Sequence, residues 1–258
     1  MASLSCGADE VGLITYRIDL HIHTVVSACA EIEMIPPLIV HRALELGLDL
    51  IAITDHNTAE NVEAVQGAAK GTTLRVMPGM EVQTREEAHI LCLFDTVEQI
   101  CAWQARVYNS LPSARNSPEV FGAQYVVSAA GDYVCENERL LLTSVGMSTE
   151  NVVAGVRELG GLPIAAHVDR PSYSLLASLG FVPAGLELAG LEISRRHTAE
   201  SFRVAYPELG HWPLIGSSDA HRLSDLAVRT EAFMAGCTVA ELELALQGSG
   251  GRYVRLVG

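Results

Sequence analysis

Several features that would assign the 258-residue chain to a common class of protein are missing from its sequence. No apolar run approaches the roughly 18 residues that a membrane-spanning helix needs, so we expect no membrane partner. The segment from Met1 to Ile14 has neither a basic region nor an apolar core, which argues against a secretory signal. No two cysteines form a CxxC pair, which is typical of reduced, mostly buried thiols in a cytoplasmic protein. The six cysteines are Cys6, Cys29, Cys92, Cys101, Cys135 and Cys237.

Basic residues are also scarce. The chain has 17 Lys and Arg against 31 Asp and Glu, which gives a net charge of −14. Because binding to a nucleic-acid backbone depends on clustered Lys and Arg, this balance predicts no such binding. There is no Gly-x-Ser-x-Gly motif, and the glycines at 160–161 and 249–251 lack a phosphate-loop pattern. We therefore expect neither a serine nucleophile nor a nucleotide-binding loop.

What the sequence does contain is a large apolar fraction, 49%, arranged in a regular alternation. Apolar runs at 48–54 and 162–167 are typical of buried parallel strands, and helical patterns near 36–46, 59–69 and 149–159 separate such runs. This rhythm predicts a parallel α/β architecture in a single domain, 1–258. The segment 108–147 breaks it with Tyr125–Val127 and Tyr133–Val134 around a turn at Gly131–Asp132. We interpret this segment as an inserted β-hairpin that caps the fold or contacts another subunit.

Polar residues suited to metal binding gather where the expected strands end. His21 and His23 are two residues apart, a spacing that directs both imidazoles to one face of a strand. Side chains at the ends of parallel barrel strands converge on one face, where active sites lie. The set is His21, His23, His56, Glu81, His89, His167, Asp219 and His221.

Imidazoles and carboxylates are ligands of Zn²⁺, Mn²⁺ and Fe²⁺, and none of these positions holds a cysteine, which argues against a closed structural zinc site. So many ligands exceed the needs of one ion. We therefore expect a multinuclear hydrolytic centre.

Five motifs in order resemble the signature of the PHP family, named for polymerase and histidinol phosphatase. They are His21–Ile22–His23, Thr54–Asp55–His56–Asn57, Gly79–Met80–Glu81–Val82, Ala166–His167 and Ser218–Asp219–Ala220–His221. The resemblance runs from about residue 17 to 226. It implies a distorted (β/α)7 TIM-like barrel with the hairpin insertion and two or three divalent ions, Zn, Mn or Fe.

The resemblance also implies a division of the ligands. One ion would take His21, His23, Glu81 and Asp219; Glu81 would bridge to a second, held with His89 and His221; His56 and His167 would hold the third with an acidic residue. Many relatives have Ser-Asp-Gly after the first motif, whereas this chain has Ser27–Ala28–Cys29. The family's spacing indicates Glu31 instead, with Glu33 and Cys29 as alternatives, and a centre of two ions stays open.

Further residues are candidates for catalysis and substrate binding. Relatives carry an arginine shortly after the fourth motif, so Arg170 is expected to hold phosphate in catalysis. Arg195 is a second candidate for substrate binding, with a surface ion pair as the alternative, and His197 is a candidate general acid. Asp55 either orients a ligand imidazole during catalysis or caps a helix. Asn57 is the remaining candidate substrate contact.

These features predict a metal-dependent phosphoesterase that hydrolyses a small phosphate monoester, a phosphorylated metabolite or nucleotide, through a metal-bridged hydroxide. The expected partner is thus a small phosphorylated substrate. Two alternatives stay open: a metal-dependent hydrolase of an amide or lactone, and a non-catalytic metal-binding PHP module. The oligomeric state is not predicted.

Overall fold

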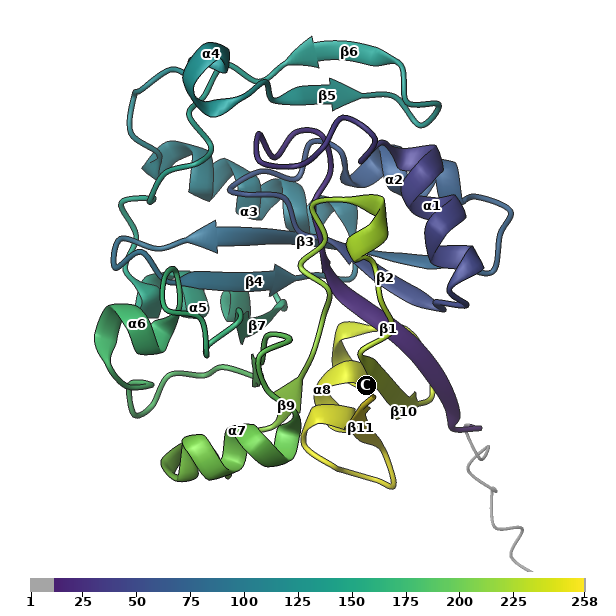
Figure 1. Cartoon of the computed structure of the whole chain (residues 1–258), viewed down its shortest axis with the longest axis vertical. Coiled ribbons are helices and arrows are strands. Elements are labelled where there is room, and N and C mark those ends of the chain that lie inside the picture. The colour runs from purple at the N-terminus through teal and green to yellow at the C-terminus, as the bar shows by residue number, and fades with distance from the viewer. Residues whose placement is uncertain (1–11, 258) are drawn as a thin grey trace, which may run out of the picture.

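A nine-stranded sheet forms the centre of the fold in a computed structural model that describes residues 12–257 (Figure 1). The strands lie in the order β11-β10-β1-β2-β3-β4-β7-β8-β9, and the end strands β9 and β11 contact each other. The sheet therefore curls into a nearly closed barrel, and the expected α/β barrel class is confirmed. The strands are β1 (Ile14–Ile22), β2 (Leu50–Ile53), β3 (Arg75–Gln83), β4 (His89–Leu93), β7 (Leu162–Ala165), β8 (Gly190–Glu192), β9 (Leu214–Ile215), β10 (Thr230–Met234) and β11 (Tyr253–Leu256).

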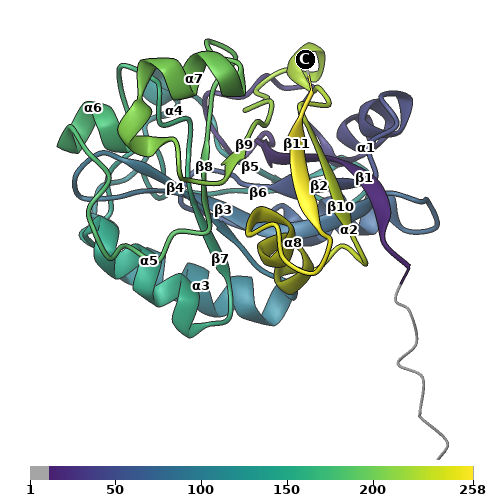
Figure 2. The same ribbon diagram turned by 90° about the horizontal axis from the view of Figure 1, so that it is seen from below.

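Helices surround this sheet. Figure 2 shows α1, α3, α5 and α7 around its outside. Pro36 begins α1, a position where the missing N–H costs no hydrogen bond, and Thr96 caps α3 with a capping box. In contrast, α8 contributes Leu242 and Leu246 to a core cluster that also holds Leu20 and Ile164 from the strands. The helices are α1 (Pro36–Glu45), α2 (Val62–Ala69), α3 (Val97–Ser110), α5 (Thr149–Glu158), α6 (Leu175–Leu179), α7 (Ala199–Ala205) and α8 (Val239–Leu246), with short 3-10 turns at Pro207–Leu209 and Leu223–Asp225.

The sheet is mixed rather than purely parallel as expected. β3 and β4 form an antiparallel pair, with Gln83 opposite His89, because the connection at 84–88 is too short for a parallel crossover. His89 therefore begins its strand, yet it lies at the end of the barrel where the parallel strands finish. β4 also pairs antiparallel with β7, and β10 extends the sheet where the sequence pattern predicted no strand.

The inserted segment 108–147 forms the expected hairpin, with β5 (Tyr125–Val127) and β6 (Tyr133–Glu136) following the short helix α4 (Pro118–Phe121). It lies against the loop after β1, where the Tyr125 N–H donates to the Val25 carbonyl at 3.1 Å (Figure 1). The side chain of Asn57 donates to the carbonyls of Leu141 and Thr143, both at 2.8 Å. These contacts attach the insertion to the loops that carry the histidines.

The cysteines of the described residues are free thiols, but the expectation that most are buried is wrong. Only Cys92 is buried, whereas Cys29, Cys101 and Cys135 are exposed and Cys237 is half-buried. Cys101 lies on the surface side of α3, and Cys135 belongs to the solvent-facing hairpin, so neither is part of the core. Cys6 lies outside the described residues, as do residues 1–11 of the segment in which we expected no secretory signal. Within 12–257 no helix is long and apolar enough to span a membrane.

Candidate metal centre

Glu81 lies at the centre of the histidine cluster. Its Oε1 is 2.8 Å from Nδ1 of His89, 3.1 Å from Nε2 of His167 and 3.2 Å from Nε2 of His21. Its Oε2 lies 2.9 Å from Nδ1 of His56. A single buried carboxylate thus contacts imidazoles that are carried by four different segments.

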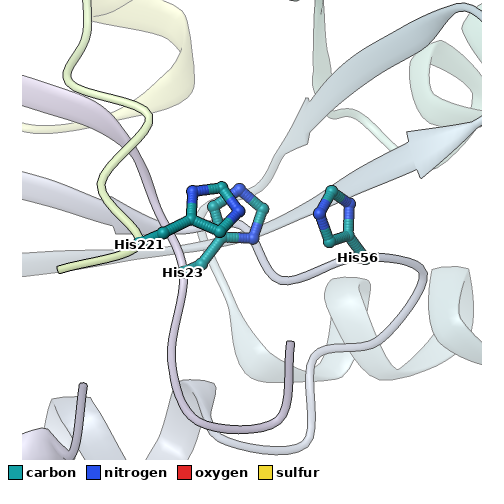
Figure 3. A group of neighbouring side chains, drawn as sticks. All are labelled: His23, His56 and His221. Carbon is teal, nitrogen blue, oxygen red and sulfur yellow. The ribbon is translucent and has the colours of Figure 1, made fainter. Parts of the chain in front are cut away.

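A second group of imidazoles is formed by His23, His56 and His221. The rings of His23 and His221 stack with their centroids 4.1 Å apart, and those of His23 and His56 are 4.5 Å apart. Figure 3 shows these three imidazoles converging from separate loops. Oδ1 of Asp219 completes the contact at 3.2 Å from Nε2 of both His21 and His23. Sets of three residues with donor atoms within 4.8 Å of one another are His23, His56 and His221; His21, His23 and Glu81; and His56, Glu81 and His89.

Backbone strain accompanies this arrangement. His167 has φ of 28° and Asp219 has φ of 51°, both in the left-handed region that favours glycine. Such conformations cost free energy and persist at functional sites, where the surrounding structure enforces them. They are further evidence that this end of the barrel is built for a purpose other than stability.

The hydrogen bonds of His21 and His23 indicate that a cation belongs between them. Nδ1 of His21 faces Oε2 of Glu192 at 3.0 Å, and Nδ1 of His23 faces Oγ of Ser27 at 3.0 Å. Ser27 Oγ itself donates to Asp55 at 2.7 Å, so it accepts from His23. When both imidazoles are neutral, both Nε2 atoms therefore present lone pairs, only 3.1 Å apart. That contact is favourable only with a proton or a metal ion between the two nitrogens, so the residues present fit a divalent cation.

The charges of the cluster point the same way. Burial opposes ionisation of Glu81, but His89, His21 and His56 hold the pKa of its carboxyl well below its ordinary value. Burial and the neighbouring His221 and His56 push the pKa of His23 well below its usual range, and burial lowers the pKa of His89 to about 4. Carboxylates and neutral imidazoles are the forms that bind metals.

His21 behaves differently. Burial lowers its pKa, but Asp219, Glu192 and Glu81 outweigh burial and raise the pKa well above its usual range. A raised pKa favours the protonated form of His21 in the metal-free protein. Metal binding should displace that proton.

His167 and His221 have exchanged the neighbours that the family resemblance implied for them. His167 lies with His89 on Oε1 of Glu81, whereas His221 lies against His23 and His56. The expected pairing of His89 with His221, and of His56 with His167, is therefore not what the structure brings together. The strand order explains this, since β4 and β7 are neighbours and residue 220 pairs with the end of β1.

The structure places Cys29, not Glu31, at the cluster. The side chain of Glu31 is 45% exposed and pairs with Arg222 at 2.9 Å, outside the group of histidines. Glu33 is exposed as well. Cys29 lines the same cavity as His56 and His221. Partial desolvation raises the pKa of its thiol, but His221 and His56 outweigh that effect and lower the pKa to about 6.

Arginines line the cavities beside the cluster. Arg170 pairs with Oδ2 of Asp219 and lines two adjoining cavities of about 310 and 290 Å³, which also share His167 and Asp219. Arg195 and Arg196 line the first cavity, and Arg195 donates to the carbonyl of Asp225. Arg170 and Arg195, the two expected phosphate contacts, thus both line the first cavity.

Three other candidates take different positions. Asn57 is buried, and its amide is fully engaged by backbone groups of the insertion and of Gln83, so it does not face a substrate. The ring of His197 packs on Phe202 and Tyr206, and among the described residues it lines neither cavity. The expected roles of Asn57 and His197 are thus not supported by their positions.

The carboxylate of Asp55 is joined to His23 through the hydroxyl of Ser27. Its carboxylate accepts from the Thr24 N–H at 2.6 Å, the Thr24 hydroxyl at 2.8 Å and Ser27 at 2.7 Å. Ser27 in turn holds His23, so Asp55 acts on the cluster through Ser27. The N-cap of α2 is Asn61, which excludes the alternative that Asp55 caps that helix.

Sequence reasoning missed Glu192. Its Oε2 faces Nδ1 of His21 and accepts from the His167 N–H, each at 3.0 Å, so it holds two members of the cluster. A signal was present, because Glu192 follows apolar residues in the buried strand β8 just as Glu81 follows the buried apolar run 77–80 in β3.

Comparison with known proteins assigns the chain to a family. A model of the PHP domain matches residues 19–155, more than half of the sequence. The chain belongs to the PHP domain family, and its fold is that of metal-dependent phosphoesterases, hydrolases of phosphoester or phosphodiester bonds.

Among curated relatives, the 5'-3' exoribonuclease Rnm of Salmonella typhimurium is 37% identical over 73 residues, which cover 28% of this chain and 24% of the relative. The matched region thus spans about a quarter of that relative's length. A 5'-3' exoribonuclease of Haemophilus influenzae is 31% identical over 74 residues, 29% of this chain and 26% of the relative.

Solved structures share the fold. The lesion-specific endonuclease PfuEndoQ of Pyrococcus furiosus superposes with a TM-score of 0.70 at 19% identity, covering 93% of this chain and 58% of that one. An Endonuclease Q complex with a 27-mer duplex substrate has a TM-score of 0.69 at 20% identity, with the same coverage.

These relatives correct one expectation. The sequence predicted a small phosphorylated partner and no binding to a nucleic-acid backbone, whereas the relatives are named as nucleases and one is complexed with duplex DNA. The inference from net charge was wrong because net charge averages over the whole surface, while binding depends on the charge at the site.

Proposed function

We propose that this chain is a metal-dependent nuclease that hydrolyses phosphodiester bonds in nucleic acid, with RNA as the first candidate substrate. The nuclease names of its relatives support this proposal, and the relatives matched by sequence act, by name, on RNA. The observation that carries it is the pair of adjoining cavities that share His167, Arg170 and Asp219. One cavity is lined by the imidazoles and the other by arginines, as a phosphodiester flanked by a second nucleotide requires.

The residues that would hold the ions are His21, His23, His56, Glu81, His89, His167, Asp219 and His221. When bound, dications of this kind activate water and offset the charge that develops on the phosphoryl oxygens. Zn²⁺, Mn²⁺ and Fe²⁺ all suit imidazole and carboxylate ligands.

The chain's own contribution is to position these groups and the substrate. Oδ1 of Asp219 faces His21 and His23, while Oδ2 faces Arg170, so one carboxylate serves the metal side and the substrate side together. Arginine has five N–H donors, so Arg170 keeps donors for a phosphate oxygen while it contacts Asp219. Arg195 and Arg196, both exposed, are available to the phosphate of the neighbouring nucleotide.

The test is cleavage of end-labelled single-stranded RNA, single-stranded DNA and abasic duplex DNA by protein loaded separately with Zn²⁺, Mn²⁺ or Fe²⁺. We expect labelled fragments from at least one substrate, and none from His23→Ala purified in the same way. Arg170→Ala should lower kcat/KM by about 100-fold, as losing a charged donor at a reacting group does, with metal content unchanged. Arg106→Ala removes an arginine that pairs with Glu158 on the surface and should match the wild type. If fully metal-loaded protein cleaves none of these substrates, the proposal is wrong.

A further inference from the structure

The loop that follows β1 is held in place by its backbone. The Ser27 N–H donates to Thr24 at 3.0 Å and the Ala30 N–H donates to Ser27 at 2.8 Å, which forms two consecutive turns. The Glu31 N–H then donates to the carbonyl of His221 at 2.9 Å. These bonds hold the backbone of the loop at Glu31 beside His221.

Within this loop, the side chains of Glu31 and Cys29 point to different surroundings. The carboxylate of Glu31 pairs with Arg222, whereas Cys29 lines the same cavity as His56 and His221. Cys29 therefore shares a cavity with the two imidazoles, whereas the carboxylate of Glu31 does not.

An independent observation shows that this place suits a cation. Nitrogens of His23, His56 and His221 lie within 4.8 Å of one another. Oε2 of Glu81, which is 1% exposed, lies 2.9 Å from Nδ1 of His56 and 3.5 Å from Nε2 of His23, and among the described residues neither contact has hydrogen-bond geometry. A buried carboxylate oxygen that faces two imidazoles without hydrogen-bond geometry makes this a favourable position for a cation.

We propose that the Cys29 sulfur binds the ion held by His56 and His221, in place of a carboxylate. This inference rests on the proposed metal centre. On binding, the S–H bond breaks, the sulfur forms a bond to the ion and the proton passes to solvent. One thiolate and two imidazoles leave a fourth position open for water or substrate, the arrangement of catalytic rather than structural zinc sites. A soft thiolate makes this position prefer Zn²⁺ over Mn²⁺.

The test is the absorption spectrum of the protein loaded with Co²⁺, because a cobalt–thiolate bond gives a charge-transfer band in the near ultraviolet that imidazole and carboxylate ligands do not. The wild type should show this band, and Cys29→Ser and Cys29→Asp should lack it. Metal analysis should find one ion fewer per chain in Cys29→Ser, and the full number in Cys29→Asp, which restores an anionic ligand. Cys135→Ser, an exposed cysteine of the hairpin, should retain both the band and the ions.

A second measurement needs no variant. Iodoacetamide should alkylate Cys29 in chelator-treated protein, and saturating Zn²⁺ should protect it, while Cys101 and Cys135 react equally in both conditions. A band that persists in Cys29→Ser, or alkylation of Cys29 that Zn²⁺ does not slow, would overturn the assignment. None of these readouts requires a substrate, so the ligand can be established even if the nuclease proposal fails.

Discussion

Glu192 allows the centre to be perturbed without changing any atom that would bind an ion. Its carboxylate is buried, and its Oε2 accepts hydrogen bonds from Nδ1 of His21 and from the backbone N–H of His167, each at 3.0 Å. Burial opposes its ionisation, but His21 keeps its pKa below the ordinary value, so it is charged at neutral pH. Glutamine in its place keeps an oxygen for both hydrogen bonds and removes only the charge. Alanine removes the charge and the hydrogen bonds.

The expected effects differ in size. Groups that orient a ligand histidine contribute about 10- to 100-fold to metal affinity. We expect Glu192→Gln to weaken metal binding about 10-fold, roughly 1.4 kcal/mol, since only the basicity of His21 falls. Glu192→Ala should weaken it about 100-fold, because His21 also loses its orientation. In addition, Glu192→Ala leaves two buried donors unsatisfied, which should lower the free energy of unfolding of the metal-free protein by about 1–3 kcal/mol for each.

Metal affinity is measured by competition with a chromophoric chelator, and the free energy of unfolding by urea titration of chelator-treated protein. Glu158→Gln changes an exposed carboxylate that pairs with Arg106 and serves as the matched control. If Glu192→Ala bound metal within a factor of two of the wild type, Glu192 would not orient the centre.

Three further outcomes follow from other contacts. Burial raises the pKa of Asp19 to about 6 from 3.8, so the folded state holds this proton more tightly than the unfolded state. The free energy of unfolding of metal-free protein should therefore fall by about 3 kcal/mol as the pH rises through that window. Urea titrations from pH 4 to 7 should show this fall in the wild type but not in Asp19→Asn. Asn57→Ala removes the two hydrogen bonds that the Asn57 amide donates to the insertion. It should lower the free energy of unfolding by about 1–3 kcal/mol and speed proteolysis within 108–147, whereas Asn151→Ala, on the surface of α5, should do neither. Equal proteolysis in both variants would contradict this. If Arg170, Arg195 and Arg196 each contact one phosphate, log affinity for single-stranded RNA should fall with log salt at a slope of about −2, and Arg196→Ala should reduce that slope by about 0.7; a slope near zero would exclude these contacts.

The residues of the candidate centre could be predicted because the sequence pattern shows where each buried strand ends. An apolar run followed by His, Asp or Glu predicts both a buried strand and a polar residue at its end, and Glu81 and His167 are examples. Gly131 likewise predicts a turn, because glycine adopts the left-handed region readily, and the structure gives it a φ of 86°. In both cases the signal is local in the sequence.

The failures concern contacts between distant segments. Spacing along the chain does not reveal which strands are neighbours, so the partners of His167 and His221 could not be read from it. His221 lies beside His23 because residue 220 pairs with Ile22 near the barrel's closure. Nor can counting residues predict how a turn directs its side chains, which is why spacing indicated Glu31 while the structure places Cys29 at the cluster.

The error about nucleic acid has a related cause, since net charge contains no information about where charges lie. At physiological ionic strength the Debye length is about 8 Å, so acidic residues across the molecule have little influence on a phosphate at the centre. In the proposed complex that phosphate would meet Arg170, Arg195 and Arg196 together with ions whose charge would exceed that of Glu81 and Asp219. An acidic chain can therefore present a positive site, but only while its ions are bound. The affinity of this protein for RNA should accordingly depend on metal occupancy more steeply than on any single arginine, and chelation should abolish binding that Arg196→Ala only weakens.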